Sequence, residues 1–384
     1  MTRPRRRAQP VPGFYIGLMS GTSLDGVDGV LADFPEGACP RVLAHRQATF
    51  DPALRTELLA LNQPGSNELH RAALAANALM RVYAAVVSAL IEAAGVERAG
   101  VDAIGAHGQT VRHQPLAVDG VGYTLQLVNG ALLAELCGVD VVCDLRSRDL
   151  AAGGQGAPLV PAFHAAAFAA VPRPLAVLNL GGIANLTLLP AAGAVMGFDC
   201  GPGNLLLDHW CQRTLGRAYD EGGRWAADGR VQAQLLQRLL AEPFLDRAPP
   251  KSTGRELFDP AWLDAALADF AAAGGSASPQ DVQATLAQFS VEAAAAALDR
   301  HLPSATRLLV CGGGAANADL MRRLQQRLPG MAVTDTGAHG VPPQQVEALA
   351  FAWLARAHRR REPGNLPQVT GARGPRILGA LYPA

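Results

Sequence analysis

The sequence has little lysine and no net charge. Lys251 is the only lysine, although the chain carries 33 basic residues in 384 positions. The 33 acidic residues balance them, which argues against nucleic acid as the main partner, because such proteins carry a marked basic excess. The single ammonium group reflects either chance survival in an arginine-rich chain or a need for a compact point charge.

The chain also lacks paired cysteines and a long apolar run. Its six cysteines are scattered without a Cys-x-x-Cys pair, which speaks against a common zinc site and favours a reducing compartment. No apolar stretch of signal-peptide length follows the basic start, and no run of about 18 apolar residues occurs. We therefore expect a cytoplasmic protein with a disordered basic tail at residues 1–12 and no membrane partner.

Length and hydrophobic pattern predict two α/β domains. A chain of 384 residues exceeds the size at which a single core usually keeps growing. An apolar strand, a glycine-bearing turn and a second apolar strand occur at 14–34 and again at 175–189, as expected after a duplication. We expect two lobes facing each other across a cleft. The N-terminal lobe is predicted at 13–148 plus 365–384, and the C-terminal lobe, with the nucleotide site, at 149–364.

Three glycine-bearing turns are candidates for a nucleotide site. The first, Gly-Thr-Ser-Leu-Asp-Gly-Val-Asp at residues 21–28, offers hydroxyls and backbone N–H groups to an anion. It is not a Walker loop, because it lacks Gly-Lys-Ser/Thr and precedes a strand. Alone it is most simply a hairpin turn. Together with the turns at Gly181-Gly182 and 312–314, it favours a nucleotide site split between two domain faces.

Two aspartates have positions suited to phosphoryl transfer. Asp25 lies in the first turn, and Asp199 ends a predicted strand just before a Gly-Pro-Gly-Asn turn. A carboxylate at the carboxyl end of a strand is well placed to act as a general base or to bind a metal indirectly. The alternative for Asp199 is to cap the helix predicted from about Asn204.

Seven segments together resemble the anhydro-N-acetylmuramic acid kinase family. They follow one another in this order: Ile16–Asp28, Ala106–Thr110, Asp149–Phe163, Asn179–Asn185, Phe198–Asn204, Lys251–Glu256 and Cys311–Asn317. The match runs from about residue 14 to the C-terminus. The resemblance implies the two-domain fold shared by sugar kinases, Hsp70 and actin, a duplicated ribonuclease H-like α/β fold with an interdomain active-site cleft.

The resemblance also implies a reaction. Water opens the 1,6-anhydro ring of 1,6-anhydro-N-acetylmuramic acid, and the freed O6 takes the γ-phosphoryl group of ATP during peptidoglycan recycling. Asp199 falls on the family's catalytic aspartate, and Asp25 is our candidate for holding Mg²⁺ directly or through water. The residues expected to bind ATP are Gly21, Thr22, Ser23, Leu24, Asp25, Gly26, Val27, Asp28, Gly181, Gly182, Gly312, Gly313, Gly314 and Asn317.

Several residues are candidates for binding the sugar. A planar arginine suits its lactyl carboxylate, and Arg148 is the first choice by the resemblance, with Arg146 second. Either arginine can instead form a surface ion pair. His107 and Gln109 end a predicted strand and are expected to bind sugar hydroxyls, although His107 has a purely structural role as its alternative.

Two charged residues keep open assignments. Lys251 is expected to serve function within its six-residue motif, bound either to phosphate or in an interdomain ion pair. Glu347 begins the last predicted helix and either reaches the cleft or stabilises that helix start.

Two other functions fit a two-lobed ATP-binding fold. A nucleotide switch of the actin or chaperone type needs ATP but no water-activating carboxylate beside a sugar. An ordinary hexose kinase uses Asp199 to deprotonate a sugar hydroxyl rather than water. The resemblance favours the coupled kinase over both, and it implies a homodimer.

Overall fold

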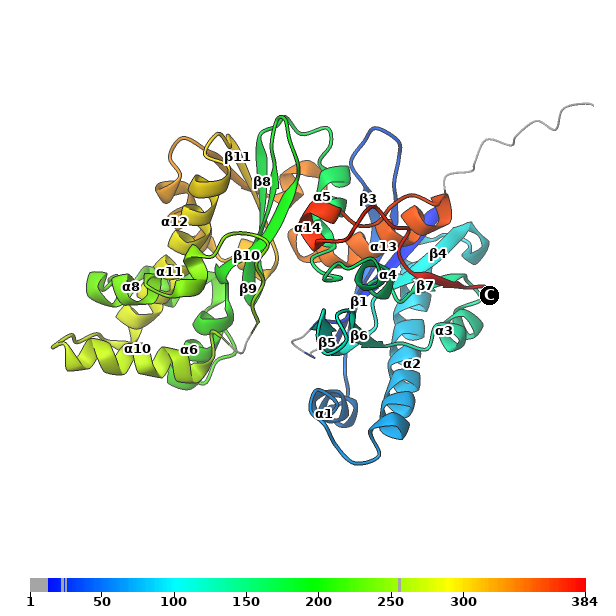
Figure 1. Cartoon of the computed structure of the whole chain (residues 1–384), viewed down its shortest axis with the longest axis horizontal. Helices are drawn as coiled ribbons and strands as arrows, with labels where there is room; N and C mark the ends of the chain where they lie inside the picture. Colours follow the sequence, from blue (N-terminus) through cyan, green and yellow to red (C-terminus); the bar gives the residue numbers. More distant parts are fainter. Residues whose placement is uncertain (1–12, 22–23, 25, 255–256) are drawn as a thin grey trace, which may run out of the picture. The chain divides into compact units, whose positions relative to one another are not determined.

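The protein divides into two compact units. The computed structural model describes residues 13–21, 24, 26–254 and 257–384. The first unit holds the described residues up to Ala157 together with Glu347–Asn365 and Ala372–Ala384, and the second holds Pro158–Val346 and Leu366–Gly371 (Figure 1). These boundaries differ from the expected ones mainly in the last long helix, which belongs to the first unit.

The first unit is built on a six-stranded sheet with the order β13-β7-β4-β1-β2-β3. Strands β1, β2 and β3 form an antiparallel meander, and β4 and β7 continue the sheet from β1 in parallel. The C-terminal strand β13 closes the far edge by antiparallel pairing with β7. The strands are β1 Phe14–Met19, β2 Gly26–Asp33, β3 Arg41–Thr49, β4 Val101–Ala106, β7 Val141–Cys143 and β13 Ala380–Tyr382.

The second unit repeats this plan in a five-stranded sheet with the order β10-β9-β8-β11-β12. Again three strands form an antiparallel meander and two more continue in parallel from the first of them. The strands are β8 Leu175–Leu180, β9 Ile183–Leu189, β10 Met196–Pro202, β11 Arg307–Cys311 and β12 Ala332–Asp335. The shared strand order and direction confirm the predicted duplication of an α/β unit.

One long helix dominates the core of the first unit. Helix α2 (Glu68–Ala94) ends at Gly95, whose left-handed backbone supplies the predicted stop. By length and composition alone α2 is apolar enough to cross a membrane. Its residues Leu79, Met80 and Tyr83 are fully buried in the unit's core, so α2 has the packing of a core helix. The smaller helices are α1 Pro52–Ala60, α3 Gly130–Cys137 and α4 Ser147–Ala151.

Helix α11 (Pro279–His301) has the same central place in the second unit. Fourteen of its side chains are buried, and Ser278 caps its first turn by accepting a bond from the Asp281 N–H. The other helices of at least four residues are α5 Val160–Ala167, α6 Leu205–Leu215, α7 Arg224–Ala227, α8 Ala233–Leu240, α9 Pro243–Asp246, α10 Pro260–Ala272, α12 Ala318–Arg327 and α14 Pro367–Thr370. The hydrophobic core therefore surrounds α11 on one side of the five-stranded sheet.

The last long helix, α13 (Val346–Arg360), packs on the first unit because two strand glycines admit it. A Cβ atom at Gly17 of β1 would lie 1.8 Å from the Ala348 carbonyl oxygen, and one at Gly105 of β4 would lie 2.0 Å from that of Phe351. Any side chain at these positions would push the helix away. The sequence pattern placed this helix in the second lobe because it gives no sign of its packing partner.

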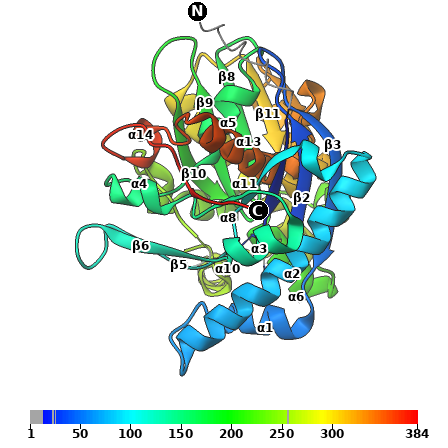
Figure 2. The same cartoon turned by 90° about the vertical axis from the view of Figure 1, so that its right-hand side faces the viewer.

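The β5–β6 hairpin was only half predicted: the sequence pattern indicated a strand at residues 123–127, which is β6, but missed β5. Strands β5 (Gln109–Pro115) and β6 (Gly122–Leu127) pair only with each other, and Figure 2 shows them as an extended ribbon ending in a loop. The short elements α1, α5 and β12 were also not predicted. The hairpin begins directly at the end of β4, and so at the pocket described below.

Candidate active site

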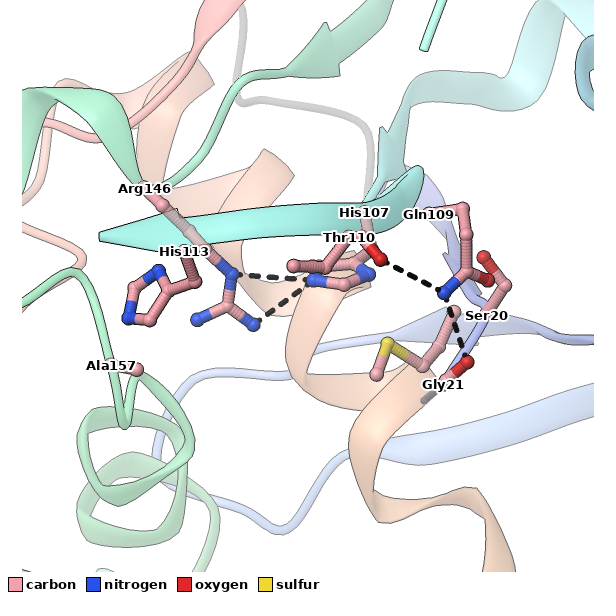
Figure 3. A pocket seen from close by; sticks show the side chains of 9 residues that line it. Ser20, Gly21, His107, Gln109, Thr110, His113, Arg146 and Ala157 are labelled. Carbon is pink, nitrogen blue, oxygen red and sulfur yellow. Dashed lines mark hydrogen bonds between the residues drawn. The ribbon is translucent and has the colours of Figure 1, made fainter. Parts of the chain in front are cut away.

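A pocket of about 230 Å³ lies at the carboxyl ends of β1 and β4 in the first unit (Figure 3). Its lining combines the end of the β1 strand with the start of the β5 strand and the segment before α4. The lining residues are Met19, Ser20, Gly21, His107, Gln109, Thr110, His113, Arg146 and Ala157. Three residues expected from the sequence, Gly21, His107 and Gln109, therefore lie together here.

Arg146 fixes the tautomer of His107. Its Nε and Nη2 atoms lie 3.2 and 3.0 Å from His107 Nε2, and a guanidinium only donates hydrogen bonds. His107 Nε2 is therefore the acceptor, and its proton sits on Nδ1. Burial, reinforced by the Arg146 charge, lowers the pKa of His107 to about 3, so the ring is neutral at physiological pH. The buried Nδ1 has no hydrogen bond of good geometry among the described residues, and the backbone of Gly108 and Ser20 lies near enough to act on the ring.

Gln109 complements this donor with an acceptor. Its side-chain nitrogen donates to the Gly21 carbonyl at 3.1 Å and to the Thr110 carbonyl at 3.4 Å (Figure 3). These bonds fix the amide orientation and leave its buried Oε1 without a described partner. The pocket lining thus contains both a donor and an acceptor, and a hydroxyl group uses both.

The two candidate arginines occupy different environments. Arg146 lines the pocket, half-buried, and its Nη1 donates to the Gly156 carbonyl at 2.8 Å. Arg148 is exposed on helix α4 and does not line the pocket. Three of the five N–H groups of Arg146 have described partners, so two remain for a ligand. The geometry favours Arg146, the second choice from the sequence.

The buried carboxylate of Asp149 fixes the backbone at Gly156, to which Arg146 donates a hydrogen bond. Asp149 is fully buried, and its Oδ2 accepts the Gly156 N–H at 2.8 Å while Oδ1 accepts the Asn365 amide at 2.6 Å. Gly156 thus bonds Asp149 through its N–H and Arg146 through its carbonyl. This role of Asp149 could not be predicted, since a lone aspartate in a Gly-rich stretch carries no sign of its burial.

The first glycine-bearing turn is only partly described. Thr22, Ser23 and Asp25 lie outside the described residues. Leu24 and Val27 are buried in the core of the first unit, so only their backbone is available to a nucleotide. The remaining predicted members divide between the turn and the strand: Gly21 lines the pocket, while Gly26 and Asp28 belong to β2.

Two acidic side chains lie near this turn. Asp28 Oδ1 accepts bonds from His45 Nε2 at 3.0 Å and from Gln47 Nε2 at 2.6 Å. Glu347 is exposed at the start of α13, close enough to Arg146 and Asp28 for their charges to act on it. Glu347 therefore belongs to the surroundings of the first-unit pocket.

Asp199 lies on β10 in the second unit, where an irregularity of the strand follows it. Its Oδ2 accepts the Thr253 N–H at 2.9 Å, and its own N–H donates to the Lys251 carbonyl at 3.1 Å. Asp199 does not cap helix α6, whose Asn204 cap position makes no side-chain cap bond. Two described residues of the Lys251 motif that the sequence singled out, Lys251 and Thr253, thus bond to the predicted base.

Lys251 donates to main-chain carbonyls. Its Nζ lies 3.1 Å from the Phe244 oxygen and 2.9 Å from the Leu245 oxygen, and 4.8 Å from the centre of the Phe244 ring. These carbonyls end the short helix α9. Burial lowers the pKa of Lys251. All described contacts of its ammonium lie within the second unit.

The other two glycine-bearing turns lie in the second unit. The Gly181 carbonyl accepts the Asn204 N–H at 2.8 Å, which joins the β8–β9 turn to the turn before α6. Gly312 has a φ of 79°, and a Cβ there would lie 2.3 Å from Asn179 Oδ1, so this position requires glycine. At Gly181, Gly182 and Gly313 an added Cβ would meet nothing closer than 3.5 Å.

Gly314 and Asn317 have structural roles beside their predicted one. Gly314 is buried against Leu180. Asn317 caps α12 by accepting the Leu320 N–H at 3.0 Å. The exposed faces of Gly181, Gly182 and Gly313 are therefore the places where a nucleotide can approach the backbone closely.

The described residues offer few ligands for a magnesium ion. Across residues 13–21, 24, 26–254 and 257–384, no cluster of three or more His, Cys, Asp or Glu side chains has the arrangement of a metal site. Mg²⁺ in kinases keeps several waters and takes one or two carboxylates besides phosphate oxygens. The predicted ligand Asp25 is outside the described residues.

Comparison with known proteins identifies the relatives of this chain. The family model described as anhydro-N-acetylmuramic acid kinase matches residues 13–384. The anhydro-N-acetylmuramic acid kinase of Variovorax paradoxus is 62% identical over 375 residues, covering 96% of this chain and 99% of the relative. The one from Bordetella petrii is 59% identical over 386 residues, with full coverage of both chains.

Solved structures are more distant. The activator of 2-hydroxyisocaproyl-CoA dehydratase from Clostridium difficile with bound ADPNP has a TM-score of 0.45 at 12% identity, covering 91% of this chain and 96% of that chain. The assignment therefore rests on the relatives in sequence. They define this protein as an ATP-using phosphotransferase, a kinase, and its two α/β units share one strand order. The chain belongs to the anhydro-N-acetylmuramic acid kinase family.

Proposed function

We propose that the chain converts 1,6-anhydro-N-acetylmuramic acid, ATP and water to N-acetylmuramic acid 6-phosphate and ADP in peptidoglycan recycling. Membership of the kinase family supports the substrate and the reaction class. The observation that carries the mechanism is the Asp199 carboxylate, which a backbone N–H holds by one oxygen on an irregular strand.

Asp199 acts as the general base in this proposal. A water molecule attacks the anomeric carbon, and Asp199 takes its proton as the bond between C1 and O6 breaks. The pair of electrons left on O6 attacks the γ-phosphorus of ATP, and ADP leaves. The proton on Asp199 then passes to solvent. No nucleophilic side chain is required, because no covalent intermediate forms on the protein.

The first-unit pocket holds the sugar in this proposal. Arg146 has two N–H groups for the lactyl carboxylate, a pairing that planar guanidinium makes well. His107 Nδ1 and Gln109 Oε1 supply one donor and one acceptor for hydroxyl or amide groups of the sugar. The proposal thus assigns residues of both units to one reaction.

ATP is proposed to bind along the glycine-bearing turns. Gly181, Gly182 and Gly313 have open faces that admit phosphate or ribose close to the backbone, which is the fit a nucleotide needs. Gly21 and its neighbours are assigned to the phosphates, with Asp25 as the Mg²⁺ ligand. Bound Mg²⁺ would offset the charge of the transferring phosphoryl group. We further propose that the protein is cytoplasmic and forms a homodimer. Size-exclusion chromatography with light scattering tests the homodimer.

The test is an assay with the anhydro sugar, ATP and ¹⁸O-labelled water. We expect one label at the anomeric hydroxyl of a 6-phosphorylated product, because water supplies that oxygen. Equal phosphorylation of glucose or of free N-acetylmuramic acid would instead indicate an ordinary sugar kinase. ATP hydrolysis without any phosphorylated sugar would indicate a nucleotide switch, and either outcome overturns the proposal.

A further inference from the structure

We infer that Lys251 is a positioning residue for Asp199: its ammonium group anchors the segment whose backbone holds the catalytic carboxylate. This inference rests on the proposed role of Asp199 as the base. Lys251 lies 6 positions after Leu245 in the sequence, and its ammonium group bonds the Leu245 carbonyl in helix α9. Nothing in the proposed chemistry itself requires a second charge at this place.

The segment from Lys251 to Gly254 has no helix or strand of its own. This segment bonds Asp199 twice, once at the backbone and once at the side chain. The Lys251 carbonyl accepts the Asp199 N–H, and the Thr253 N–H donates to Asp199 Oδ2 at 2.9 Å. The direction of the carboxylate therefore depends on where this irregular segment lies.

The Lys251 ammonium is the side-chain anchor of that segment. It bonds two successive carbonyls, at Phe244 and Leu245, and lies 4.8 Å from the Phe244 ring centre. Phe244 is itself 1% exposed in the core of the second unit. With the Phe198 ring centre 5.9 Å away as well, four attractive contacts of one charge tie this irregular segment to buried parts of the second unit.

The shape of the cation explains why lysine is retained where every other basic residue is arginine. An ammonium group is compact and has three donors that can point at two adjacent carbonyls and leave one over. A guanidinium is planar and larger, and its donors have a fixed fork geometry, so arginine is not a conservative replacement at this position. The same geometry speaks against phosphate binding, because the described bonds of Nζ go to the protein.

The experiment compares Lys251→Met, Asp199→Asn and the double variant in the kinase assay. We expect Lys251→Met to lower kcat by about 100-fold with little change in the KM for ATP, because a base displaced by about 1 Å loses that much rate. In the double variant kcat should fall no more than about twofold below that of Asp199→Asn, since Lys251 acts through Asp199.

Arg300→Met is the matched control. Arg300 donates to the same Leu245 carbonyl at 3.3 Å and to Asp246, but it has no described bond to residues 251–254. Its removal takes a cation from the same helix end and should leave kcat within about twofold of the parent. A loss equal to that of Lys251→Met would show that any charge there serves stability alone, and would overturn the inference.

Chemical rescue keeps the test valid if Lys251→Met folds poorly. Lys251→Cys, made in a Cys39→Ser background, is alkylated with 2-bromoethylamine, so that the thiolate displaces bromide and an ammonium of nearly lysine length results. The other five native cysteines are buried. We expect the alkylated protein to regain at least tenfold in kcat, and the background protein treated alike to change little. No regain of kcat would contradict the inference.

The outcomes separate this inference from the proposed function. Full activity of Asp199→Asn would overturn the function and with it the inference. Loss of activity in Asp199→Asn but full activity in Lys251→Met would overturn the inference alone. Multiplicative losses in the double variant would assign Lys251 an independent role, which also contradicts positioning.

Discussion

The two units share a backbone turn but use it differently. After β4 in the first unit comes Gly108 with a φ of 75°, and after β11 in the second comes Gly312 with a φ of 79°. The residue before the glycine is His107 in one unit and Cys311 in the other. One turn therefore presents a polar ring to a pocket, and the other leads into the open backbone of Gly313. Duplication preserved the turn, while the side chains around it diverged.

The sheet ladders differ in the same way. The meander strands β8, β9 and β10 of the second unit correspond to β1, β2 and β3 of the first. When the two sheets are matched at these turns, the pair of Asp199 (β10) with Asn185 (β9) corresponds to the pair of Gln47 (β3) with Asp28 (β2). In the first unit this position holds a neutral amide, and the Gln47 side chain donates a hydrogen bond of 2.6 Å to Asp28 on the neighbouring strand. The second unit has a carboxylate there. Under the proposed function, the residue at this ladder position is the base in the second unit and a structural amide in the first.

The largest expected effect separates Asp199 from its counterpart Gln47. Asp199→Asn keeps the hydrogen bond from Thr253 but cannot take a proton, so kcat should fall by about 1,000-fold while ATP still binds. Gln47→Ala should leave kcat within about twofold. Steady-state kinetics and nucleotide binding measure both. Near-normal turnover of Asp199→Asn would remove the functional difference between the ladders.

A second pair of variants tests which arginine binds the carboxylate. Arg146→Met should lower kcat/KM for the sugar by about 100-fold, because it removes a charge-assisted pair and frees the ring of His107. Arg148→Met changes an exposed residue two positions away and should cost less than about threefold. The opposite ranking would return the role to Arg148 and mean that the first-unit pocket does not hold the lactyl group.

A third, smaller effect concerns the open turn of the second unit. Gly313→Ala should fold normally, since an added Cβ would meet only Asn204 Nδ2 at 3.7 Å. If a nucleotide lies on that face, the KM for ATP should rise about tenfold at nearly constant kcat. Gly330→Ala is the control, because nothing lies within 4 Å of its added Cβ. Equal KM values for the two variants would place the nucleotide elsewhere.

The smallest expected effect concerns the protonation of two buried histidines, His107 in the first unit and His164 in the second. Burial lowers the pKa of His107 and of His164 to about 3. The unfolded chain binds protons at these sites below about pH 6.5 while the folded chain does not, so both units should lose stability as pH falls from 6.5 towards 3. NMR of ¹⁵N-histidine-labelled protein should find both rings neutral from pH 5 to 8, with His107 protonated on Nδ1. Titration of either ring within that range would contradict this assignment.

Much of the fold follows from local pattern. The predicted strands at 14–19, 101–106 and 175–180 match the structure, because short apolar runs bounded by glycine and polar turns are strong strand signals. The β5 strand was missed, since Gln109 to Pro115 is polar and pairs only with another exposed strand. The unit of α13 was missed because packing on Gly17 and Gly105 is a contact between distant parts of the chain.

The candidate site divides in the same way. The segments containing His107, Asp199 and Lys251 were identified from the sequence, because their residue types and neighbours form motifs. Their partners were not, since hydrogen bonds such as that from Arg146 to His107 join residues 39 positions apart. The tautomer of His107 and the choice between two arginines became decidable only with those distances. The roles of Asp25, Thr22 and Ser23, which lie outside the described residues, remain predictions.

The order in which the units are encoded has a consequence for biosynthesis. The first unit needs helix α13 and the edge strand β13, and the edge strand is synthesised after the whole of the second unit. The second unit is almost entirely encoded between Pro158 and Val346. Its core is thus available for folding while the first unit still waits for its final strand, so the N-terminal half of the nascent chain is the part that spends longer in need of a chaperone.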